Sequence, residues 1–374
     1  MKLFVVAGEA SGDARGAELM RALKARAPSV TFLGAGGPQM RALADGALLD
    51  WADEAVVGLW DVLKKYGYFR ARFAEMLAEI GREKPMALIL IDYPGFNLRL
   101  AKAARARHPE MKIIYYISPQ VWAWHRSRIP EMARMLDLML CIFPFEKPLY
   151  EKSGLRTEFV GHPMLDSLAA KRIATPRDER LVALLPGSRG KEVRRIFPTM
   201  LAAAQRMRKA RPDLRFEASA ASALLAEEMR GVIAAARLDE EFCAVKTGTA
   251  HELMQTAVAG MVCSGTATLE AAYFGLPMTI IYKVAWLTWV VGRRLVQVDF
   301  LGMPNLLAGR EIVREYLQEA AQPGPIATEM LRLASDTTVR AATQRELASV
   351  VEILGEAGAG TRAAMCIVAE LRLA

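Results

Sequence analysis

Short apolar runs alternate with segments of helical periodicity along most of this chain. An apolar run of about four to eight residues indicates a strand buried on both faces, and a helix-period segment between two such runs indicates a crossover helix. The alternation therefore predicts parallel sheets covered by helices. The expected strands are Leu3–Ala7, Thr31–Leu33, Ala87–Ile91, Ile113–Ile117, Leu138–Ile142, Val182–Leu185, Arg215–Ala220, Cys243–Val245, Gly260–Cys263 and Met278–Tyr282.

A polar stretch divides these strands into two sets. The segment from Asp166 to Arg180 contains Pro176 and no apolar periodicity, which is typical of an interdomain linker. A chain of 374 residues also exceeds the size that one core usually serves. The predicted fold class is α/β, with two doubly wound Rossmann-like domains that face each other across a cleft and bind ligands at the carboxyl ends of their strands.

Composition narrows the class of protein. The chain is 53% hydrophobic and 24% charged, as in globular proteins, and the apolar region 257–291 is interrupted too often to span a membrane. The net charge of +8 suits a phosphorylated substrate or an anionic membrane surface. Nucleic acid is not an expected partner, because the basic residues form no arm, finger or known motif. Four cysteines without C-x-x-C spacing and an N-terminus without a signal peptide indicate a cytoplasmic protein.

Two strings each close an apolar strand and open a helix, namely 184–189 and 264–270. A tight glycine turn at such a point leaves the first helical N–H groups unpaired, and the helix dipole favours a phosphate there. Arg189 can add a bidentate contact to that phosphate, and Glu270 can accept hydrogen bonds from a ribose diol. Ordinary loop and N-cap chemistry is the alternative for either string alone. The pair predicts a nucleotide diphosphate site formed by Ser188, Arg189, Ser264, Gly265, Thr266 and Glu270.

Polar strings also follow the strands of the first half, so they are expected on one rim of the first sheet. The string 8–13 lacks the Walker lysine and the G-x-G-x-x-G spacing, and it suits the close approach of a sugar or acyl chain. Ser11 and Asp13 are therefore candidates for positioning an acceptor. Asp92 directly follows a strand and is a candidate general base, with a helix N-cap as the alternative. His162, before a proline, is interpreted as a substrate-positioning residue, although such a histidine is equally often structural.

Metal and cofactor chemistry has little support in the sequence. The four histidines show no ligand spacing, and no Asp-x-Asp pair is present to hold a magnesium diphosphate. No metal and no other cofactor is therefore predicted. The charge of a leaving group is then expected to be met by helix ends and Arg189. The string 187–190 also differs from the nucleophile elbow of serine hydrolases.

The segment 56–72 mixes large apolar residues with lysine and arginine. This mixture suits an amphipathic helix on a membrane, and a core-packed helix with a solvated basic face fits the pattern equally well. The candidate membrane contacts are Trp60, Val62, Leu63, Tyr66 and Phe69.

Taken together, these strings resemble the lipid-A-disaccharide synthase family nearly end to end. The resemblance rests on the strings 8–13, 118–124, 143–147, 161–162, 184–190, 264–270 and 304–311 and on the Asp92 loop. It implies a GT-B fold and an inverting glycosyltransferase that needs no metal. The implied reaction transfers 2,3-diacylglucosamine from its UDP carrier to 2,3-diacylglucosamine 1-phosphate and gives a β-1,6-linked disaccharide 1-phosphate and UDP. The enzymes of this family are peripheral, which implies the cytoplasmic face of the inner membrane and its anionic lipids as a partner.

The resemblance also implies an arrangement of domains and sites. It gives an acceptor-binding domain over residues 1–166, onto which helices at about 350–374 can pack back, and a UDP-sugar domain over 181–345. Asp92, Arg189 and Asn305 fall on activity-critical positions of the family, Asn305 on the donor side. Gly95 departs from members that carry an acid there, so it is given no role. Some members form homodimers by exchanging C-terminal regions, which is a possible state for this chain.

Rival functions remain open at this stage. One is a GT-B N-acetylglucosaminyltransferase that acts on a polyprenyl-linked acceptor. Another is a UDP-sugar 2-epimerase, which shares the fold and transfers nothing. A nucleotide-binding module without activity is a third, and the many polar loops of the first half disfavour it.

Overall fold

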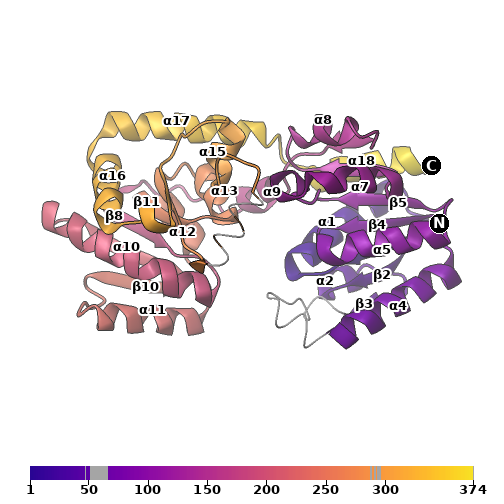
Figure 1. Ribbon diagram of the computed structural model, residues 1–374, viewed down its shortest axis with the longest axis horizontal. Coiled ribbons are helices and arrows are strands. Elements are labelled where there is room, and N and C mark those ends of the chain that lie inside the picture. Colours follow the sequence, from indigo (N-terminus) through magenta and orange to yellow (C-terminus); the bar gives the residue numbers. More distant parts are fainter. Residues whose placement is uncertain (47, 51–65, 287–288, 290–291, 293–295, 374) are drawn as a thin grey trace. The chain divides into compact units, whose positions relative to one another are not determined.

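A computed structural model describes residues 1–46, 48–50, 66–286, 289, 292 and 296–373. The chain forms two compact units. Unit 1 comprises Met1–Pro163 and Leu354–Ala374, and unit 2 comprises Met164–Ile353. Within each unit a parallel sheet lies between layers of helices (Figure 1). This architecture confirms the predicted α/β class with doubly wound sheets.

Unit 1 contains a seven-stranded sheet of order β3-β2-β1-β4-β5-β6-β7. The strand order reverses between β1 and β4, which is the topological switch point where ligands bind in open α/β sheets. All the pairings are parallel. The strands are β1 (Lys2–Ala7), β2 (Thr31–Gly36), β3 (Leu48–Asp50), β4 (Ala87–Ile91), β5 (Lys112–Tyr116), β6 (Leu138–Cys141) and β7 (Thr157–Phe159).

Both faces of this sheet are buried, which explains why its strands are continuously apolar. Leu3 and Val5 of β1 pack on one side with α1 and α18, whereas Phe4 and Val6 pack on the other with α4, α5 and α7. The helices are α1 (Ala10–Arg26), α2 (Pro38–Arg41), α4 (Tyr66–Glu83), α5 (Pro94–Arg107), α6 (Val121–Trp124), the short η2 (Arg126–Arg128), α7 (Ile129–Met135), α8 (Glu146–Glu151) and α18 (Ala359–Leu371).

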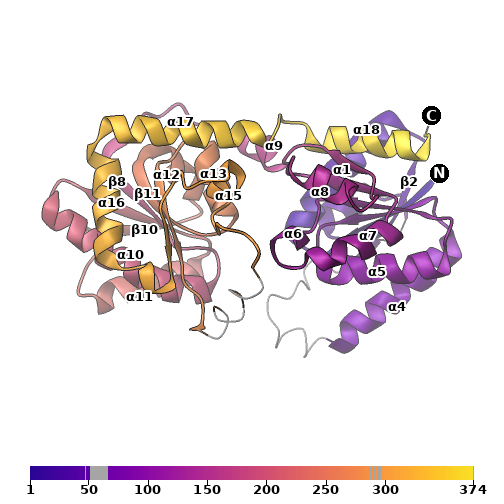
Figure 2. The same ribbon diagram turned by 45° about the horizontal axis from the view of Figure 1, so that its top comes forward.

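The C-terminal helix α18 completes unit 1. It packs along α1 (Figure 2), and its small residues Ala359, Ala363 and Ala364 are fully buried there. Arg362 holds the start of the helix, because its Nε donates to the carbonyl of Val160 at 2.8 Å. Unit 1 is therefore built from two segments that are far apart in the sequence.

Unit 2 contains a six-stranded sheet of order β10-β9-β8-β11-β12-β13, with the switch point between β8 and β11. Its strands are β8 (Asp178–Leu185), β9 (Arg215–Ala220), β10 (Cys243–Thr247), β11 (Ala257–Cys263), β12 (Met278–Tyr282) and β13 (Glu315–Leu317). Its helices are α9 (Met164–Ala169), α10 (Gly190–Ala210), α11 (Ala223–Ala235), α12 (Ala250–Thr256), α13 (Thr266–Tyr273), α15 (Met303–Ala308), η3 (Gln318–Ala320), α16 (Pro323–Ser335) and α17 (Thr337–Ile353).

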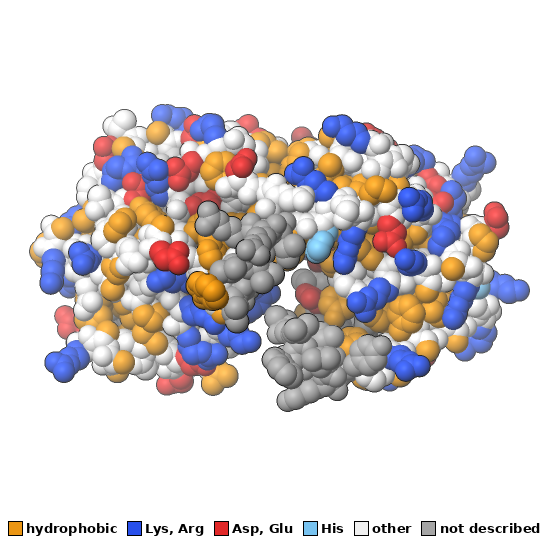
Figure 3. Space-filling model, in the orientation of Figure 1, with side chains coloured by type: hydrophobic (Ala, Val, Ile, Leu, Met, Phe, Trp, Pro, Cys, Tyr) orange, Lys and Arg blue, Asp and Glu red, His pale blue; other side chains and the backbone are white. Residues whose placement is uncertain are grey.

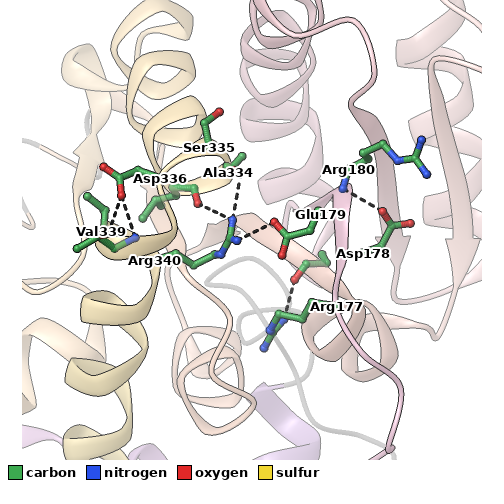
Figure 4. A network of polar contacts seen from close by, with 12 residues as sticks. Arg177, Asp178, Glu179, Arg180, Ala334, Ser335, Asp336, Val339 and Arg340 are labelled. Carbon is green, nitrogen blue, oxygen red and sulfur yellow. Dashed lines mark hydrogen bonds and ion pairs between the residues drawn. The ribbon is translucent and has the colours of Figure 1, made fainter.

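The segment 166–180, interpreted from the sequence as an interdomain linker, lies within unit 2 and is anchored on it. Arg177 donates from Nη1 to the carbonyls of Met254 at 2.9 Å and Ala257 at 2.6 Å. Its burial, with the nearby charge of Arg340, lowers the pKa of the guanidinium to about 10. Arg340 in turn donates to Glu179 at 2.6 Å (Figure 4). Although this segment is polar in composition, its Arg177 side chain therefore donates hydrogen bonds to backbone carbonyls at helix ends, which have no partner within the helix.

In the view of Figure 3, lysine and arginine side chains are scattered over both units. Within the described part of the chain, no helix combines the length and apolarity that a bilayer crossing requires.

Candidate functional site

The switch point of unit 1 brings together the loops that follow β1 and β4. These strands are neighbours, with Ala7 opposite Ile91. Gly8 allows close approach of the second loop, since a Cβ atom at this position would lie 2.5 Å from Cδ1 of Tyr93. Asp92 and Tyr93 both adopt left-handed backbone conformations, with φ of 46° and 48°. Two consecutive non-glycine residues in this region are uncommon and mark a constrained loop.

The Asp92 loop is held by side chains beneath it. Tyr115 donates from its hydroxyl to the carbonyl of Asp92 at 2.5 Å, and Asn97 donates to the same carbonyl at 2.7 Å. Burial, with a contribution from the negative charge of Glu9, raises the pKa of the Asp92 carboxyl to about 6. The N-cap position of α5 is Tyr93, so Asp92 is not the N-cap residue. A carboxylate with a pKa near neutrality at a switch point can accept a proton from a bound hydroxyl.

Ser11 and Asp13, the candidate acceptor residues, differ in their surroundings. Ser11 is exposed in the first turn of α1. Asp13 is buried, and its carboxylate accepts hydrogen bonds from the amides of Gly37 and Met40, both at 2.9 Å. Asp13 therefore holds the start of α2, and its buried carboxylate is occupied by backbone rather than turned toward solvent.

His162 is half-buried in unit 1. Its ring centroid is 5.3 Å from that of Phe143. Burial, with the nearby charge of Arg15, lowers the pKa of its imidazole to about 4. The ring is therefore neutral at physiological pH, and its low basicity disfavours a role as the base.

Glu146 is a buried acid that the sequence did not single out. Its carboxylate accepts hydrogen bonds from Ser118 at 2.6 Å, from the indole of Trp122 at 2.7 Å and from the amide of Phe143 at 3.0 Å. Burial raises the pKa of this carboxyl to about 7. Glu146 thus joins the loops that follow β5 and β6. A signal was present, because both loops contain unusual strings directly after strands.

The switch point of unit 2 brings together the two predicted phosphate strings. Gly187 has φ of 109°, and a Cβ atom there would lie 2.5 Å from Oε2 of Glu192. Ser188 is exposed, and the Arg189 side chain is 64% exposed at the N-cap of α10. Nη1 of Arg189 lies 3.1 Å from Oε1 of Glu192. The guanidinium is thus accessible beside unpaired amides of a long helix, which is the chemistry of an anion site.

The second predicted phosphate string, 264–270, follows β11 and contains the start of α13. Gly265 and Thr266 are exposed at the start of the helix, and Ser264 donates from its hydroxyl to the carbonyl of Leu301 at 3.0 Å. Glu270 is partly exposed one turn further along, and its Oε2 lies 3.3 Å from Nε2 of His251. The structure therefore places both strings on neighbouring strands, β8 and β11.

Asn305 occupies a different position from the one expected of a direct ligand. It is fully buried in α15, and its Nδ2 donates to the carbonyl of Val313 and to Oε1 of Glu315, both at 2.8 Å. Its Oδ1 accepts from the amides of Ile312 at 2.8 Å and Val313 at 3.0 Å. These bonds use the side chain's donors and acceptors, so Asn305 shapes the loop after α15 rather than reaching solvent.

The expected membrane segment is only partly described. Trp60, Val62 and Leu63 lie outside the described residues, and α4 begins at Tyr66. Phe69 is half-buried and packs against the core of unit 1. For Phe69, packing of α4 onto the sheet outweighs presentation to a membrane.

Among the described residues, no three acidic, histidine or cysteine side chains gather as metal ligands would. Unit 1 offers a partly desolvated carboxylate, Asp92, and unit 2 offers an accessible arginine, Arg189, at the start of a long helix.

Known proteins similar to this chain agree on one family. A family model described as Lipid-A-disaccharide synthetase matches residues 3–367. The Lipid-A-disaccharide synthase of Trichlorobacter lovleyi is 42% identical over 371 residues, covering 97% of this chain and 96% of that protein. The Lipid-A-disaccharide synthase of Geobacter sulfurreducens is 41% identical over 374 residues, covering 97% and 95%.

Solved structures share the fold at much lower sequence identity. A UDP-GlcNAc 2-epimerase from Methanocaldococcus jannaschii, in complex with UDP-GlcNAc and UDP, has a TM-score of 0.60 at 10% identity and covers 99% of this chain and 100% of that chain. A ugt transferase from Siraitia grosvenorii, in complex with UDP, has a TM-score of 0.58 at 13% identity and covers 99% of both chains. These likenesses establish a GT-B fold and leave activity to the closer relatives.

Proposed function

The chain belongs to the lipid-A-disaccharide synthase family, and from this premise we propose which residues carry its reaction. It is a glycosyltransferase of lipid A biosynthesis that uses a UDP-sugar. Its proposed donor is UDP-2,3-diacylglucosamine, and its proposed acceptor is 2,3-diacylglucosamine 1-phosphate. The products are then the β-1,6-linked disaccharide 1-phosphate and UDP. We assign the acceptor to unit 1 and the donor to unit 2.

The proposed base is Asp92. The acceptor 6-hydroxyl attacks the anomeric carbon in line as UDP leaves from the opposite face, so the configuration inverts. Asp92 takes the hydroxyl proton, which requires a carboxylate that is ionised yet basic enough to accept it. The position of Asp92 carries this assignment: it directly follows β4 at the switch point of unit 1, half-buried in a constrained loop, and burial there raises the pKa of its carboxyl to about 6. Ser11 and His162 are proposed to position the acceptor, and Asp13 to hold the loop beside it.

The proposed donor site is the switch point of unit 2. The diphosphate binds the amides that open α10 and α13, with Ser188, Arg189, Ser264, Gly265 and Thr266 around it. Arg189 stabilises the negative charge that grows on UDP, so the reaction is proposed to need no metal. Glu270 binds the ribose diol. Asn305 supports this site indirectly, because Glu315, which it holds, also accepts from the amides of Leu301 and Gly302 at 3.0 Å.

The acyl chains of both substrates imply contact with a membrane. We propose that the chain binds peripherally to the anionic cytoplasmic face of the inner membrane, through Trp60, Val62, Leu63 and Tyr66 with nearby basic residues. Each basic residue near an anionic surface contributes about 1 kcal/mol, so several of them support reversible binding. A homodimer is compatible with this proposal and is not required by it.

The experiment that tests this function is one incubation with the donor and acceptor named above, followed by mass analysis. Disaccharide 1-phosphate with an equal amount of UDP is the expected result, and it should persist in a metal chelator. An epimerised donor without UDP release would identify the epimerase activity instead. Transfer only to a polyprenyl-linked acceptor would identify the other rival, which the relatives at 41–42% identity do not favour.

A further inference from the structure

A histidine of α12 meets the carboxylate that is proposed to bind ribose. His251 lies in the first turn of α12, and its Nε2 is 3.3 Å from Oε2 of Glu270 in α13. This nitrogen is shielded from solvent, and it has no aligned hydrogen-bond partner among the described residues. A small rotation of the carboxylate brings the two groups into line, because the distance is already near that of a hydrogen bond.

The contact at the other ring nitrogen, Nδ1, determines which nitrogen of His251 carries the proton. Nζ of Lys171 lies 3.3 Å from Nδ1 of His251. An ammonium group can only donate, so Nδ1 accepts, and the single proton of the neutral ring is on Nε2. A carboxylate can only accept. The chain of contacts therefore runs in one direction, from Lys171 through His251 to Glu270.

The backbone around Lys171 is held in place by the side chains of Gln255 and Arg172. Gln255 of α12 donates to the carbonyls of Lys171 and His251, both at 2.9 Å, and its Oε1 accepts from the amide of Ile173 at 2.9 Å. The guanidinium of Arg172 lies 4.5 Å from the ring centroid of Tyr273 in α13. Residues 171–173 are thereby tied to both helices, which keeps the ammonium group beside the imidazole.

We propose that His251 is a positioning residue for nucleotide recognition. Its Nε2–H holds Oε2 of Glu270, so that Oε1 is directed to the ribose diol. A glutamate held in advance loses less side-chain freedom on binding than a free one, and this strengthens the ribose contact. His251 touches no substrate itself. The inference rests on the proposed function, because it takes Glu270 as the ribose ligand.

The test compares affinities for UDP and 2′-deoxy-UDP, measured by calorimetry. The wild-type chain should prefer UDP by about tenfold or more, the worth of a hydrogen bond to a charged group. His251→Asn keeps an acceptor near Nδ1 and removes the donor at Nε2, and His251→Phe keeps the ring alone. Both should lower the preference to about threefold or less. His251→Gln, which restores a donor near Nε2, should retain it. Glu270→Ala, which removes the carboxylate, calibrates the loss of the ribose contact.

The outcomes separate this inference from the proposed function. If Glu270→Ala abolishes the preference and both His251→Asn and His251→Phe keep it, His251 has no positioning role. If Glu270→Ala keeps it, the ribose assignment is itself wrong, and the inference fails with it. Imidazole ¹⁵N spectra of the wild-type chain provide a test that does not depend on variants folding. The chain has four histidines, and His251→Gln assigns the relevant signal. An Nδ1–H tautomer for His251 would overturn the proposal.

Discussion

At the scale of single residues, the proposed base and the arginine proposed to bind the diphosphate have opposite environments. Asp92 is partly desolvated, and its pKa is raised to about 6. Arg189 is largely exposed and already faces a carboxylate, that of Glu192. Burial suits a base, which must be able to take a proton, and exposure suits an arginine that must reach a charged ligand from solvent. Each environment therefore predicts a different response to mutation.

Asp92→Asn should lower turnover by roughly two to four orders of magnitude, the usual contribution of a general base, with little change in UDP affinity. Asparagine tolerates the left-handed backbone of this position, so the fold is expected to survive. In the wild-type chain, kcat/KM should fall about tenfold per pH unit below about pH 6, because the base becomes protonated. Near-normal turnover in a folded variant would contradict the assignment.

Stability should change in the opposite direction to activity. A carboxyl whose pKa is higher in the folded than in the unfolded state destabilises the fold when it ionises, so this cost is absent below about pH 4 and complete above about pH 6. Asp92→Asn removes it and should raise the free energy of unfolding at pH 7.5 by on the order of 2 kcal/mol. Thermal unfolding of both proteins at pH 4 and pH 7.5 measures the difference. An equal effect at both pH values would mean that ionisation of Asp92 is not the cause.

Arg189→Ala should weaken UDP binding by about 1.5–3 kcal/mol, the worth of a charge-assisted hydrogen bond. Arg194→Ala is the matched control on the same helix, because Arg194 pairs with Glu228 of α11 at 2.9 Å. It should leave UDP affinity unchanged. Glu192→Gln, which releases Arg189, should not weaken binding. Calorimetry on the three variants decides the point, and equal losses in Arg189→Ala and Arg194→Ala would indicate only a general effect of positive charge.

At the scale of helices and strands, the sequence predicted those elements that a local pattern of apolar residues determines. The long apolar strands at the centres of both sheets were predicted correctly, because each is buried on both faces. The short edge strands β3, β7 and β13 were not predicted, since three residues carry no periodic signal. Asp92 and the two predicted phosphate strings could be proposed from the sequence because each directly follows a strand, and their roles stay predictions. The surroundings of Asp13 could not be predicted, because its partners lie 24 and 27 residues further along the chain. Those of Asn305 could not be predicted either, because its partners lie in an irregular loop and in the short strand β13, which carry no periodic signal.

Asn305 shows how an element supports a site without contacting a ligand. Asn305→Ala removes hydrogen bonds to the backbone of Val313 and to Glu315, and it leaves the buried amide and carbonyl of Val313 without these partners. The expected loss of unfolding free energy is about 2–4 kcal/mol, with weaker UDP binding as a consequence. Glu311→Gln is the control, because it breaks an exposed ion pair with Arg314 in the same loop, and it should leave stability and UDP affinity nearly unchanged. Weaker UDP binding in Asn305→Ala with unchanged stability would instead make Asn305 a direct ligand.

At the scale of the whole molecule, unit 2 is one continuous segment and unit 1 is not. Two of the contacts that join the separate segments of unit 1 lie close to the ends of those segments. The amide of His162 donates to the carbonyl of Leu354 at 3.0 Å, and Arg362 donates to the carbonyl of Val160. The ends at Pro163 and Leu354 are therefore close enough for a short linker to connect them.

This continuity predicts how fragments of the chain should behave. Residues 164–353 should fold alone and bind UDP, because their sheet, core and proposed donor site lie within one segment. Residues 1–163 should not fold stably alone. Without α18 they lose the burial of Ile367, Leu371 and Leu373, which is worth about 5–9 kcal/mol and comparable to the whole stability of a domain.

Joining residues 1–163 to residues 354–374 through a short glycine-serine linker should restore cooperative unfolding. Circular dichroism and thermal melts of the three proteins, with calorimetry of UDP on the 164–353 fragment, provide the measurement. A scrambled α18 sequence of the same composition is the matched control, because it keeps the linker and chain length but not the buried face. Equal melting temperatures for residues 1–163 alone and for the joined protein would mean that α18 adds nothing to unit 1.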